Sequence, residues 1–379
     1  MHVAINGWFW KMPHTGSGQY VRQLVAYLRK VDPTLEITLI VPDIEMGDAD
    51  IVAGVNYIQT NINAKSRLGK VWFEQRIFPS YAKACEADLA HVPYWGSPLS
   101  CDIPLVVSVL DVIPLLYPVY ARGLANRLYT SLVSTSARTA THIITISQTS
   151  KLDIEERLNI PKERISVTYL APDERFHPRM GAERDVQVRD KYQLPQNFIL
   201  YLGGFDRRKQ VDQLLLAYTF VQMAEGVSRP LVIAGAEPSY DNLLFPDVRK
   251  YAQNLGVADN VHWIGYVDEA DKPSLYRLAD VFVYPSAYEG FGLPPLEAMA
   301  SGTPAIAFDT VIADEIYEDA AYLVEDARRM GGAMIALLIQ ESFREAMINQ
   351  GLALATKYNW RKTAKQTLEV YRRVLGEQG

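Results

Sequence analysis

Residues 288–302 have the sequence YEGFGLPPLEAMASG and follow the apolar segment 281–284, which is typical of a buried strand. Pro294 and Pro295 suit the start of a helix, where their missing N–H groups are no loss. Gly302 can end that helix in a left-handed conformation. The stretch therefore predicts a strand, a glycine loop, a short helix and then another strand.

The same loop and helix start suit a ligand that carries phosphate. Gly290 and Gly292 let the backbone approach a ligand closely, and free N–H groups at a helix N-terminus favour phosphate. We place Glu297 in the first helical turn, where it can accept hydrogen bonds from ribose hydroxyls. Glu289, on the loop ahead, faces a sugar or a developing positive charge. The alternative interpretation is that the glycines and prolines only shape a turn and that both glutamates are solvated.

Strands and helices alternate along the chain in two similar halves. The strands expected in the first half are 3–5, 37–41, 89–92, 105–109, 142–146 and 165–169. Those expected in the second half are 198–202, 231–235, 261–264, 281–284 and 303–307. Helical patterns separate most of them, including 20–28, 126–138, 148–158 and 211–223. This alternation implies parallel sheets built from βαβ units.

Residues 171–178 read as a linker between the halves. We therefore expect an α/β protein with two Rossmann-like domains, 1–172 and 173–357, that face each other across a cleft. A C-terminal helix in 358–379 is expected to return to the first domain. The cleft lies between the carboxyl ends of the two sheets, where open α/β sheets bind ligands.

Size and charge agree with this organisation. The chain has 379 residues, above the ~250–300 at which single cores stop growing. A net charge of −6 argues against a broad nucleic-acid-binding surface, which needs a basic excess. No stretch approaches the ~18–20 apolar residues that span a bilayer, and no basic leader precedes an apolar run. Cys85 and Cys101 are expected to be free, buried thiols of a cytoplasmic protein.

The spacing of Glu289 and Glu297, with the residues around them, resembles the donor-site signature of the retaining family-four glycosyltransferases, the group 1 type with the GT-B fold. Carried over by position, the resemblance implies that Glu297 binds the ribose of a nucleotide and Glu289 binds the donor sugar. It assigns contacts with the diphosphate and sugar to four further positions, Gly290, Phe291, Gly292 and Leu293.

A basic loop, GGFDRRKQ at 203–210, follows the first strand of the second half. In this position the resemblance implies a donor site that includes Gly204, Arg208 and Lys209. Guanidinium and ammonium groups suit a pyrophosphate leaving group, whose charge they would neutralise as the glycosidic bond breaks. The alternative is a solvated charge run at the start of a helix.

The first half carries weaker signals. Gly16 and Gly18 follow the first strand and resemble the family's glycine loop near the donor phosphate, although a dinucleotide fingerprint would need a third glycine. Asp111 matches the family aspartate and is expected beside the acceptor. Leu110 stands where the family usually has a histidine. Retaining transfer through a front-face ion pair, in which the departing phosphate takes the acceptor proton, makes that histidine helpful and not obligatory.

The resemblance implies a retaining, metal-independent hexosyltransferase that uses GDP-mannose or a UDP-sugar as co-substrate and needs no cofactor or metal. Its acceptor would be a hydroxyl group of a glycan, of a lipid-linked molecule or of a small molecule. The resemblance implies that the transfer takes place in glycan or polysaccharide biosynthesis. The sequence indicates neither the sugar nor an oligomeric state. Two alternatives stay open: a pseudo-enzyme that binds a nucleotide sugar without efficient transfer because of Leu110, and a dinucleotide-dependent oxidoreductase suggested by the fold alone.

Three further features concern the surface and the packing. Residues 65–78 mix basic and aromatic side chains, which favours either a weak peripheral contact with the inner face of a membrane or a helix that packs Trp72, Phe73 and Ile77 inward. An aromatic run at 8–10 (WFW) suggests exposed rings at an acceptor site, although a tryptophan-rich strand end can equally belong to the core. His142 and His262 lie in apolar strands and are expected to be packed.

Overall fold

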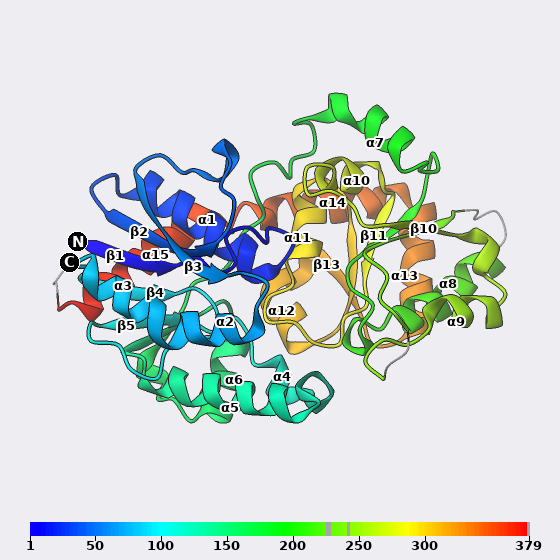
Figure 1. Ribbon diagram of the computed structural model, residues 1–379. Helices are drawn as coiled ribbons and strands as arrows, with labels where there is room; N and C mark the ends of the chain where they lie inside the picture. Colours follow the sequence, from blue (N-terminus) through cyan, green and yellow to red (C-terminus); the bar gives the residue numbers. More distant parts are fainter. Residues whose placement is uncertain (225–228, 241–242, 377–379) are drawn as a thin grey trace. The chain divides into compact units, whose positions relative to one another are not determined.

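Two parallel sheets organise the chain, one in each of the two units into which it divides (Figure 1). The first unit comprises Met1–Leu170 and the segment from Asn359 onward, and the second comprises Ala171–Tyr358. The structure is a computed structural model that describes residues 1–224, 229–240 and 243–376. The division at 170/171 lies two residues before the boundary expected from the sequence.

The first unit contains a sheet of seven parallel strands in the order β3-β2-β1-β4-β5-β6-β7. Its strands are β1 (His2–Asn6), β2 (Glu36–Asp43), β3 (Val55–Asn63), β4 (Leu89–Val92), β5 (Leu105–Ser108), β6 (His142–Thr145) and β7 (Ile165–Val167). Its helices are α1 (Gly16–Val31), α2 (Arg67–Trp72), α3 (Phe78–Ala84), α4 (Ile113–Leu116), α5 (Leu124–Thr139), α6 (Gln148–Leu158) and α15 (Trp360–Val374). The four-residue strands β4, β5 and β6 are buried throughout, as expected of a sheet covered on both faces.

The C-terminal helix α15 packs against α1 within the first unit. The Trp360 ring lies 6.2 Å from the ring of Tyr20 and 6.4 Å from that of Tyr27. At the other end, Arg372 forms an ion pair of 3.3 Å with Asp32. Residues 377–379 of the expected C-terminal segment lie outside the described residues.

His91 joins three elements in the interior of the first unit. Its Nδ1 lies 2.6 Å from Tyr371 Oη on α15, and its Nε2 lies 2.8 Å from Ser108 Oγ on β5. The imidazole is fully buried, and this burial lowers the pKa of His91 to about 3. His91 is therefore a packed, neutral residue of the core.

The burial of His91 predicts that acid destabilises the protein. The pKa of His91 is about 3 when folded and about 6.5 in an unfolded chain, so the unfolded state binds the additional proton between these values and stability is lost as pH falls below 6.5. Between pH 7 and pH 4.5, wild type should lose about 2–3 kcal/mol more unfolding free energy than His91→Gln. Urea unfolding at both pH values measures this difference. His262→Gln, at an exposed position, should behave as wild type. Parallel pH profiles of wild type and His91→Gln would contradict the prediction.

The second unit contains six parallel strands in the order β10-β9-β8-β11-β12-β13. Its strands are β8 (Ile199–Leu202), β9 (Leu231–Ala234), β10 (Val261–Gly265), β11 (Val281–Tyr284), β12 (Ala305–Phe308) and β13 (Ala321–Val324). Its helices are α7 (Asp185–Lys191), α8 (Val211–Met223), α9 (Val248–Asn254), α10 (Lys272–Leu278), α11 (Leu293–Ala300), α12 (Val311–Tyr317), α13 (Ala327–Ile339) and α14 (Glu341–Ala355).

Close packing of α8 against α13 covers part of this second sheet. A glycine, Gly331, lies where the two helices meet, and a Cβ there would come within 2.8 Å of the Ala217 carbonyl oxygen. The strand order reverses between the neighbouring strands β8 and β11. Loops that leave the carboxyl ends of two such strands diverge and create a ligand-binding position.

Two parallel sheets with intervening helices confirm the predicted fold class. Every strand expected from the sequence is present within about two residues, while β3 and β13 were not predicted. Among the described residues, no helix is both long and apolar enough to cross a bilayer. Cys85 and Cys101 are free thiols, but each is only half-buried.

The packing predictions had mixed outcomes. Trp8 and Trp10 are buried, with the Trp10 Nε1 donating to the Asp50 carbonyl at 3.0 Å, so of the two interpretations of this run the core is the correct one for these residues. Trp72, the last residue of α2, is exposed, whereas Phe73, the first residue of the π-helical turn Phe73–Ile77, is buried. His142 is packed as expected, whereas His262 is exposed on the edge strand β10.

Candidate active site

Two loops meet at the carboxyl ends of β8 and β11. The basic loop after β8 contains a short 3-10 turn, Arg207–Lys209, and the loop after β11 leads into α11. The Ala287 N–H donates to the Arg208 carbonyl at 2.8 Å, and the Arg208 guanidinium donates to the Tyr288 carbonyl at 2.6 Å. These bonds hold the two loops together, so that residues 80 positions apart share one site.

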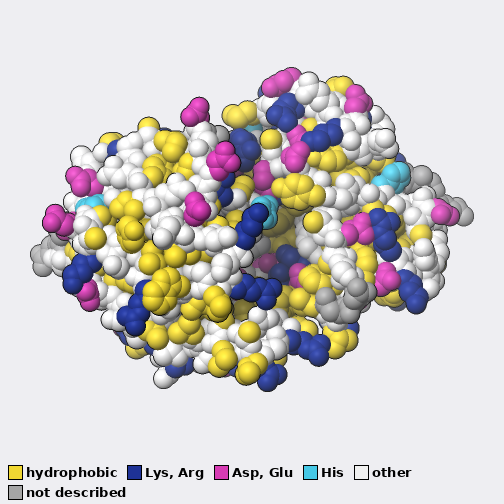
Figure 2. Space-filling view, viewed as in Figure 1, with side chains coloured by type: hydrophobic (Ala, Val, Ile, Leu, Met, Phe, Trp, Pro, Cys, Tyr) yellow, Lys and Arg dark blue, Asp and Glu magenta, His cyan; other side chains and the backbone are white. Residues whose placement is uncertain are grey.

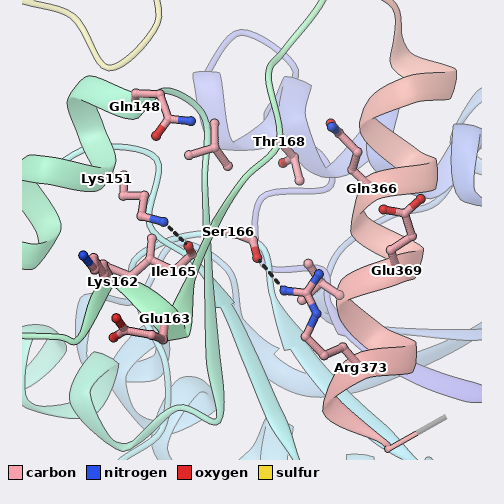
Figure 3. Close-up of a pocket in the computed structure, with 12 residues that line it drawn as sticks. Gln148, Lys151, Lys162, Glu163, Ile165, Ser166, Thr168, Gln366, Glu369 and Arg373 are labelled. Atoms are coloured by element: carbon pink, nitrogen blue, oxygen red, sulfur yellow. Dashed lines mark hydrogen bonds between the residues drawn. The ribbon is translucent and has the colours of Figure 1, made fainter. Parts of the chain in front are cut away.

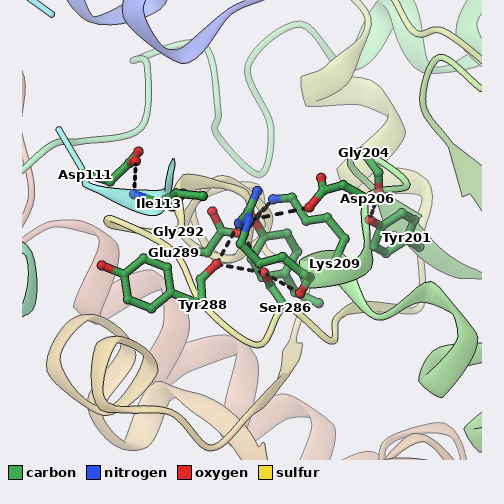
Figure 4. A network of polar contacts seen from close by, with 12 residues as sticks. Asp111, Ile113, Tyr201, Gly204, Asp206, Lys209, Ser286, Tyr288, Glu289 and Gly292 are labelled. Carbon is green, nitrogen blue, oxygen red and sulfur yellow. Dashed lines mark hydrogen bonds and ion pairs between the residues drawn. The ribbon is translucent and has the colours of Figure 1, made fainter. Parts of the chain in front are cut away.

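One carboxylate oxygen is the centre of this site (Figure 4). Glu289 Oε1 lies 2.6 Å from Lys209 Nζ and 2.5 Å from Arg208 NH1. It also accepts hydrogen bonds from Ser286 Oγ at 2.5 Å and from Tyr284 Oη at 3.0 Å. The Lys209 ammonium donates to Tyr284 Oη as well, at 2.8 Å. The sequence-predicted trio of Arg208, Lys209 and Glu289 is therefore assembled as one cluster.

The cluster carries separated charges in a largely buried place. The side chains of Arg208, Lys209 and Glu289 expose only 10%, 12% and 15% of their surface. Burial alone would raise the pKa of Glu289, but the charges of Lys209 and Arg208 outweigh it and lower that pKa to about 2. Burial also lowers the pKa of Lys209, against the opposing effect of Glu289. Asp206 lies 3.5 Å from Arg208 Nε and adds a second carboxylate.

At the start of α11, next to this cluster, the backbone N–H groups are those of Gly292 and Leu293, because Pro294 and Pro295 have none. Gly292 is the N-cap residue, with a φ of 84°, and its side-chain-free position offers no capping oxygen to the first turn. Tyr317 on α12 donates its hydroxyl to the Gly292 carbonyl at 2.8 Å, and any Cβ at Gly292 would collide with that hydroxyl. Phe291 is buried edge-on against Tyr358, with ring centroids 5.8 Å apart. The glycine loop is thus fixed from the side of the core.

The helix position of Glu297 differs from the prediction. Because α11 begins at Leu293, Glu297 is its fifth residue and lies in the second turn, not the first. Its side chain is buried and accepts a hydrogen bond from Tyr276 Oη at 3.0 Å. Burial raises the pKa of Glu297 to about 6, although the nearby Lys272 charge and the Tyr276 bond lower it. A buried carboxyl group with a pKa near neutrality is a common property of ligand-binding sites.

The remaining candidates divide between the units. Gly204, in the second unit, accepts a 2.5 Å hydrogen bond from Tyr201 at its carbonyl. Asp111, in the first unit, is half-buried after β5, and its Oδ1 accepts from the Ile113 N–H at 3.0 Å. Leu110 beside it is also half-buried.

In the glycine loop of the first unit, Gly18 has no room for a side chain, whereas Gly16 does. The Gly18 N–H donates to Thr15 Oγ1 at 3.1 Å, and a Cβ on Gly18 would collide with the Met12 carbonyl. A Cβ on Gly16 would meet nothing within 4 Å. A role of these glycines in donor binding stays a prediction.

Sequence reasoning missed the side chains that orient the acidic pair. Tyr284 and Ser286 hold Glu289, Tyr276 holds Glu297, and Tyr317 holds the glycine loop. The sequence does contain a pattern that could have indicated two of them. Tyr284 and Ser286 carry hydroxyl groups at the end of a buried strand and just after it. Within the described residues, no group of three or more His, Cys, Asp or Glu side chains could hold a metal ion.

Two family models match the chain, one for most of each unit. Residues 186–353 match the model described as glycosyl transferases group 1, and residues 14–174 match the model described as glycosyltransferase family 4. The chain belongs to the group 1 glycosyltransferases. The resemblance inferred from Glu289 and Glu297 is thereby confirmed at the level of the family.

Curated relatives of this glycosyltransferase-family chain include two from Escherichia coli. The O-antigen chain mannosyltransferase B is 35% identical over 234 residues, which cover 61% of this chain and 60% of the relative. The serotype-specific mannosyltransferase WbdA is 30% identical over 238 residues, which cover 62% of this chain and 29% of the relative. The chain therefore spans less than two thirds of the length of these relatives.

Solved structures share the whole fold of this glycosyltransferase-family chain at low sequence identity. Sucrose-phosphate synthase from Thermosynechococcus elongatus has a TM-score of 0.77 and 21% identity, covering 100% of both chains. HepE from Anabaena, in complex with UDP-glucose, has a TM-score of 0.73 and 16% identity, covering 98% of this chain and 100% of that one. Together with the two parallel sheets, these likenesses establish the GT-B fold predicted from the sequence.

Proposed function

We propose that this protein is a retaining glycosyltransferase that moves a hexose from a nucleoside diphosphate sugar to an acceptor hydroxyl in polysaccharide biosynthesis. GDP-mannose and UDP-sugars are the candidate donors, and the names of the mannosyltransferase relatives favour testing GDP-mannose first. The bound UDP-glucose of HepE supports a nucleotide sugar as the class of donor. Transfer without a metal ion is part of the proposal.

The observation that carries this proposal is the cluster of Arg208, Lys209 and Glu289 beside the start of α11. Two cations and the backbone N–H groups of Gly292 and Leu293 suit a diphosphate, and they lie next to a carboxylate that stays ionised at all ordinary pH values. Glu297, on the same helix, supplies a second carboxyl group that suits ribose hydroxyls. Phosphate, sugar and ribose each have a matching group within one unit.

We assign the following roles to these groups. Arg208 and Lys209 stabilise the charge that grows on the diphosphate as the bond between C1 of the sugar and the phosphate oxygen breaks. Glu289 Oε1 is held by its neighbours, so Oε2 is the oxygen that we propose to meet the sugar hydroxyls. The acceptor oxygen then bonds to C1 on the same face, and its proton passes to the departing phosphate. Asp111 is proposed to contact the acceptor.

Leu110 favours a second candidate, a pseudo-enzyme that binds the donor without efficient transfer. A leucine can neither donate a hydrogen bond nor move a proton, so the usual contribution of a histidine is absent at this position. In the front-face path the leaving phosphate accepts the proton, and no side chain is required for that step. Slow hydrolysis of the donor by the isolated protein separates the two candidates, since a pure binding protein shows none.

A panel of nucleoside diphosphate sugars, tested for thermal stabilisation and for hydrolysis, tests the proposal. A donor present at about 100 times its Kd should add about 2.7 kcal/mol to the free energy of unfolding. The panel is run on wild type and on Glu297→Ala, which should lose both stabilisation and turnover. A donor that stabilises without any turnover, even with acceptors present, supports the pseudo-enzyme. If no nucleotide sugar binds, the proposed function is wrong.

Donor binding should weaken in acid because of Glu297. The carboxyl group accepts hydrogen bonds from both ribose hydroxyls most strongly when it is ionised, and its pKa is raised to about 6. The Kd of the donor should therefore rise about tenfold from pH 7 to pH 5. A nucleoside diphosphate sugar has no phosphate that titrates in this range, and Glu289 stays ionised. Calorimetric titration measures the effect, and Glu297→Gln should bind weakly with no such pH dependence. An equally steep dependence in Glu297→Gln would exclude this role.

A weak peripheral contact with a membrane remains part of the proposal. Leu68 and Trp72 expose 84% and 56% of their surface on the 65–78 stretch, among basic residues. Figure 2 shows hydrophobic side chains gathered on the first unit with Lys and Arg side chains among them. Apolar residues flanked by cations suit an anionic bilayer surface. Sedimentation with vesicles, compared between wild type and Leu68→Ser/Trp72→Ser, tests this contact.

A further inference from the structure

A groove of about 410 Å³ runs along the edge strand of the first sheet. Its floor is β7, and its walls are α6 and α15 (Figure 3). All of its lining residues belong to the first unit, so it uses none of the residues of the Arg208 cluster. A volume of this size is enough for a small phosphorylated molecule.

Cations from three elements line this groove. Lys151 on α6 donates to the Ile165 carbonyl at 2.8 Å, and Arg373 on α15 donates to Ser166 Oγ at 3.4 Å. In Figure 3 these two side chains reach toward β7 from opposite helices. Lys162, at the start of the turn before β7, also lines the groove. Among the described residues, the structure gives none of these three cations an ion pair with a carboxylate.

Two carboxylates also line the groove, but they do not neutralise its centre. In Figure 3 the carboxylates of Glu163 and Glu369 point away from the place where Lys151 and Arg373 approach Ser166. The groove therefore combines cations from its walls with a hydroxyl group on its floor and leaves the acidic groups at its margins. This is the arrangement that an anion requires.

A buried histidine reports the positive field at the floor. His142 lies on the neighbouring strand β6, and its Nε2 is 2.9 Å from Ser166 Oγ. Burial and, to a smaller extent, the charges of Arg373, Arg164 and Lys151 together lower the pKa of His142 to about 4. Two of these cations, Lys151 and Arg373, line the groove and thus act on a neutral group behind it.

We propose that this groove binds a phosphate group, carried either by a small soluble molecule or by a lipid headgroup. A guanidinium offers two parallel N–H donors to phosphate oxygens, and ammonium groups supply charge without a fixed direction. Lys151 and Arg373 hold the phosphate from opposite sides, Ser166 contacts it from the floor, and Lys162 adds charge at the rim. The site does not depend on the proposed sugar transfer.

Binding of inorganic pyrophosphate at constant ionic strength tests the proposal. Calorimetry is done in an Arg208→Ala background, which weakens any contribution from the cluster in the second unit. Lys151→Gln and Arg373→Gln should each weaken binding about tenfold, as expected for the loss of a charge-assisted hydrogen bond. Arg361→Gln removes the same charge from α15 outside the groove and should leave binding unchanged.

His142 provides a local measurement that the second unit does not affect. The imidazole signal of His142 is the one that is absent from the NMR spectrum of His142→Asn. This signal is followed as the pH is varied. Pyrophosphate in the groove should raise the pKa of His142, because an anion offsets the cations that lower it. A His142 signal that does not respond to saturating pyrophosphate, or binding that is equal in the groove variants and in Arg361→Gln, would overturn the proposal.

The source of the phosphate is decided with vesicles. If the natural ligand is a lipid headgroup, vesicles containing phosphatidylglycerol should retain the protein better than phosphatidylcholine vesicles, and Lys151→Gln/Arg373→Gln should abolish the difference. If the ligand is a soluble phosphate, pyrophosphate binds but the double variant sediments with vesicles as wild type does. These measurements report on the groove, whereas the donor panel reports on the site that contains Glu297. The proposal of a phosphate site and the proposal of sugar transfer can therefore fail independently.

Discussion

Arg208→Ala is expected to lower kcat for sugar transfer about 10³-fold, with a smaller loss of donor affinity. The guanidinium lies 2.5 Å from Glu289 and donates to the Tyr288 carbonyl, so its position is fixed before any ligand arrives. A preorganised cation contributes most where negative charge increases, and the diphosphate gains charge as the sugar leaves. Steady-state kinetics with the donor identified by the panel measures both parameters.

The neighbouring arginine is a matched control for this prediction. Arg207 is exposed, and its Nε donates to the Leu243 carbonyl at 2.6 Å, away from Glu289. Arg207→Ala should therefore keep turnover within a few-fold of wild type, although it removes the same side chain from the same short turn. Arg208→Lys should recover part of the activity, since it restores charge without the planar fork. Equal losses in Arg207→Ala and Arg208→Ala would mean that the turn, and not the guanidinium, is responsible.

The donor motif could be predicted from the sequence because local rules and ligand chemistry agree there. Gly292 has the positive φ that only glycine adopts easily, and the prolines after it lie at the start of α11 as expected. The position of Glu297 within the helix could not be fixed in the same way. Glu297 is the fifth residue of α11, one position beyond the first turn, and local patterns do not fix a helix start to one residue.

The strand β3 was not predicted because an edge strand has a weaker hydrophobic pattern than a buried one. It is an edge strand, and six of its nine residues pair with β2 by register while the other side of the strand has no neighbouring strand in the sheet. Its polar residues, such as Asn56 and Gln59, are therefore exposed, and no apolar run marks the strand. The fully buried strands β8 and β11 have such runs, and both were predicted.

The aromatic run at 8–10 shows the limit for side-chain exposure. Trp8 and Trp10 both pack inward from the turn that follows β1. Trp10 finds its partners in Asp50 and Arg22, which come from distant parts of the first unit. Tertiary contacts of this kind have no counterpart in local sequence, so the sequence could not decide between an exposed acceptor surface and the core.

Glu289→Ala is expected to destabilise the protein by about 2–4 kcal/mol and to abolish transfer. The carboxylate is the shared partner of Lys209 and Arg208, and its removal leaves two cations close together in a largely buried place. Ser286 and Tyr284 lose their acceptor at the same time. Urea unfolding gives the loss of stability. Glu325→Ala, which breaks an exposed ion pair in the same unit, should cost less than about 1 kcal/mol.

The loss of stability in Glu289→Ala has two sources, the missing negative charge and the cavity that the side chain leaves. A second substitution separates these two sources. Burial already lowers the pKa of Lys209, so its ammonium is costly to keep once the carboxylate is gone. Glu289→Ala/Lys209→Met should therefore recover at least about 1 kcal/mol relative to Glu289→Ala, while transfer stays absent. If Lys209→Met brings no recovery, the loss comes from the cavity and the broken hydroxyl contacts. If Glu289→Ala is as stable as wild type, Glu289 does not hold the two cations in place, and the donor site is assembled by another group.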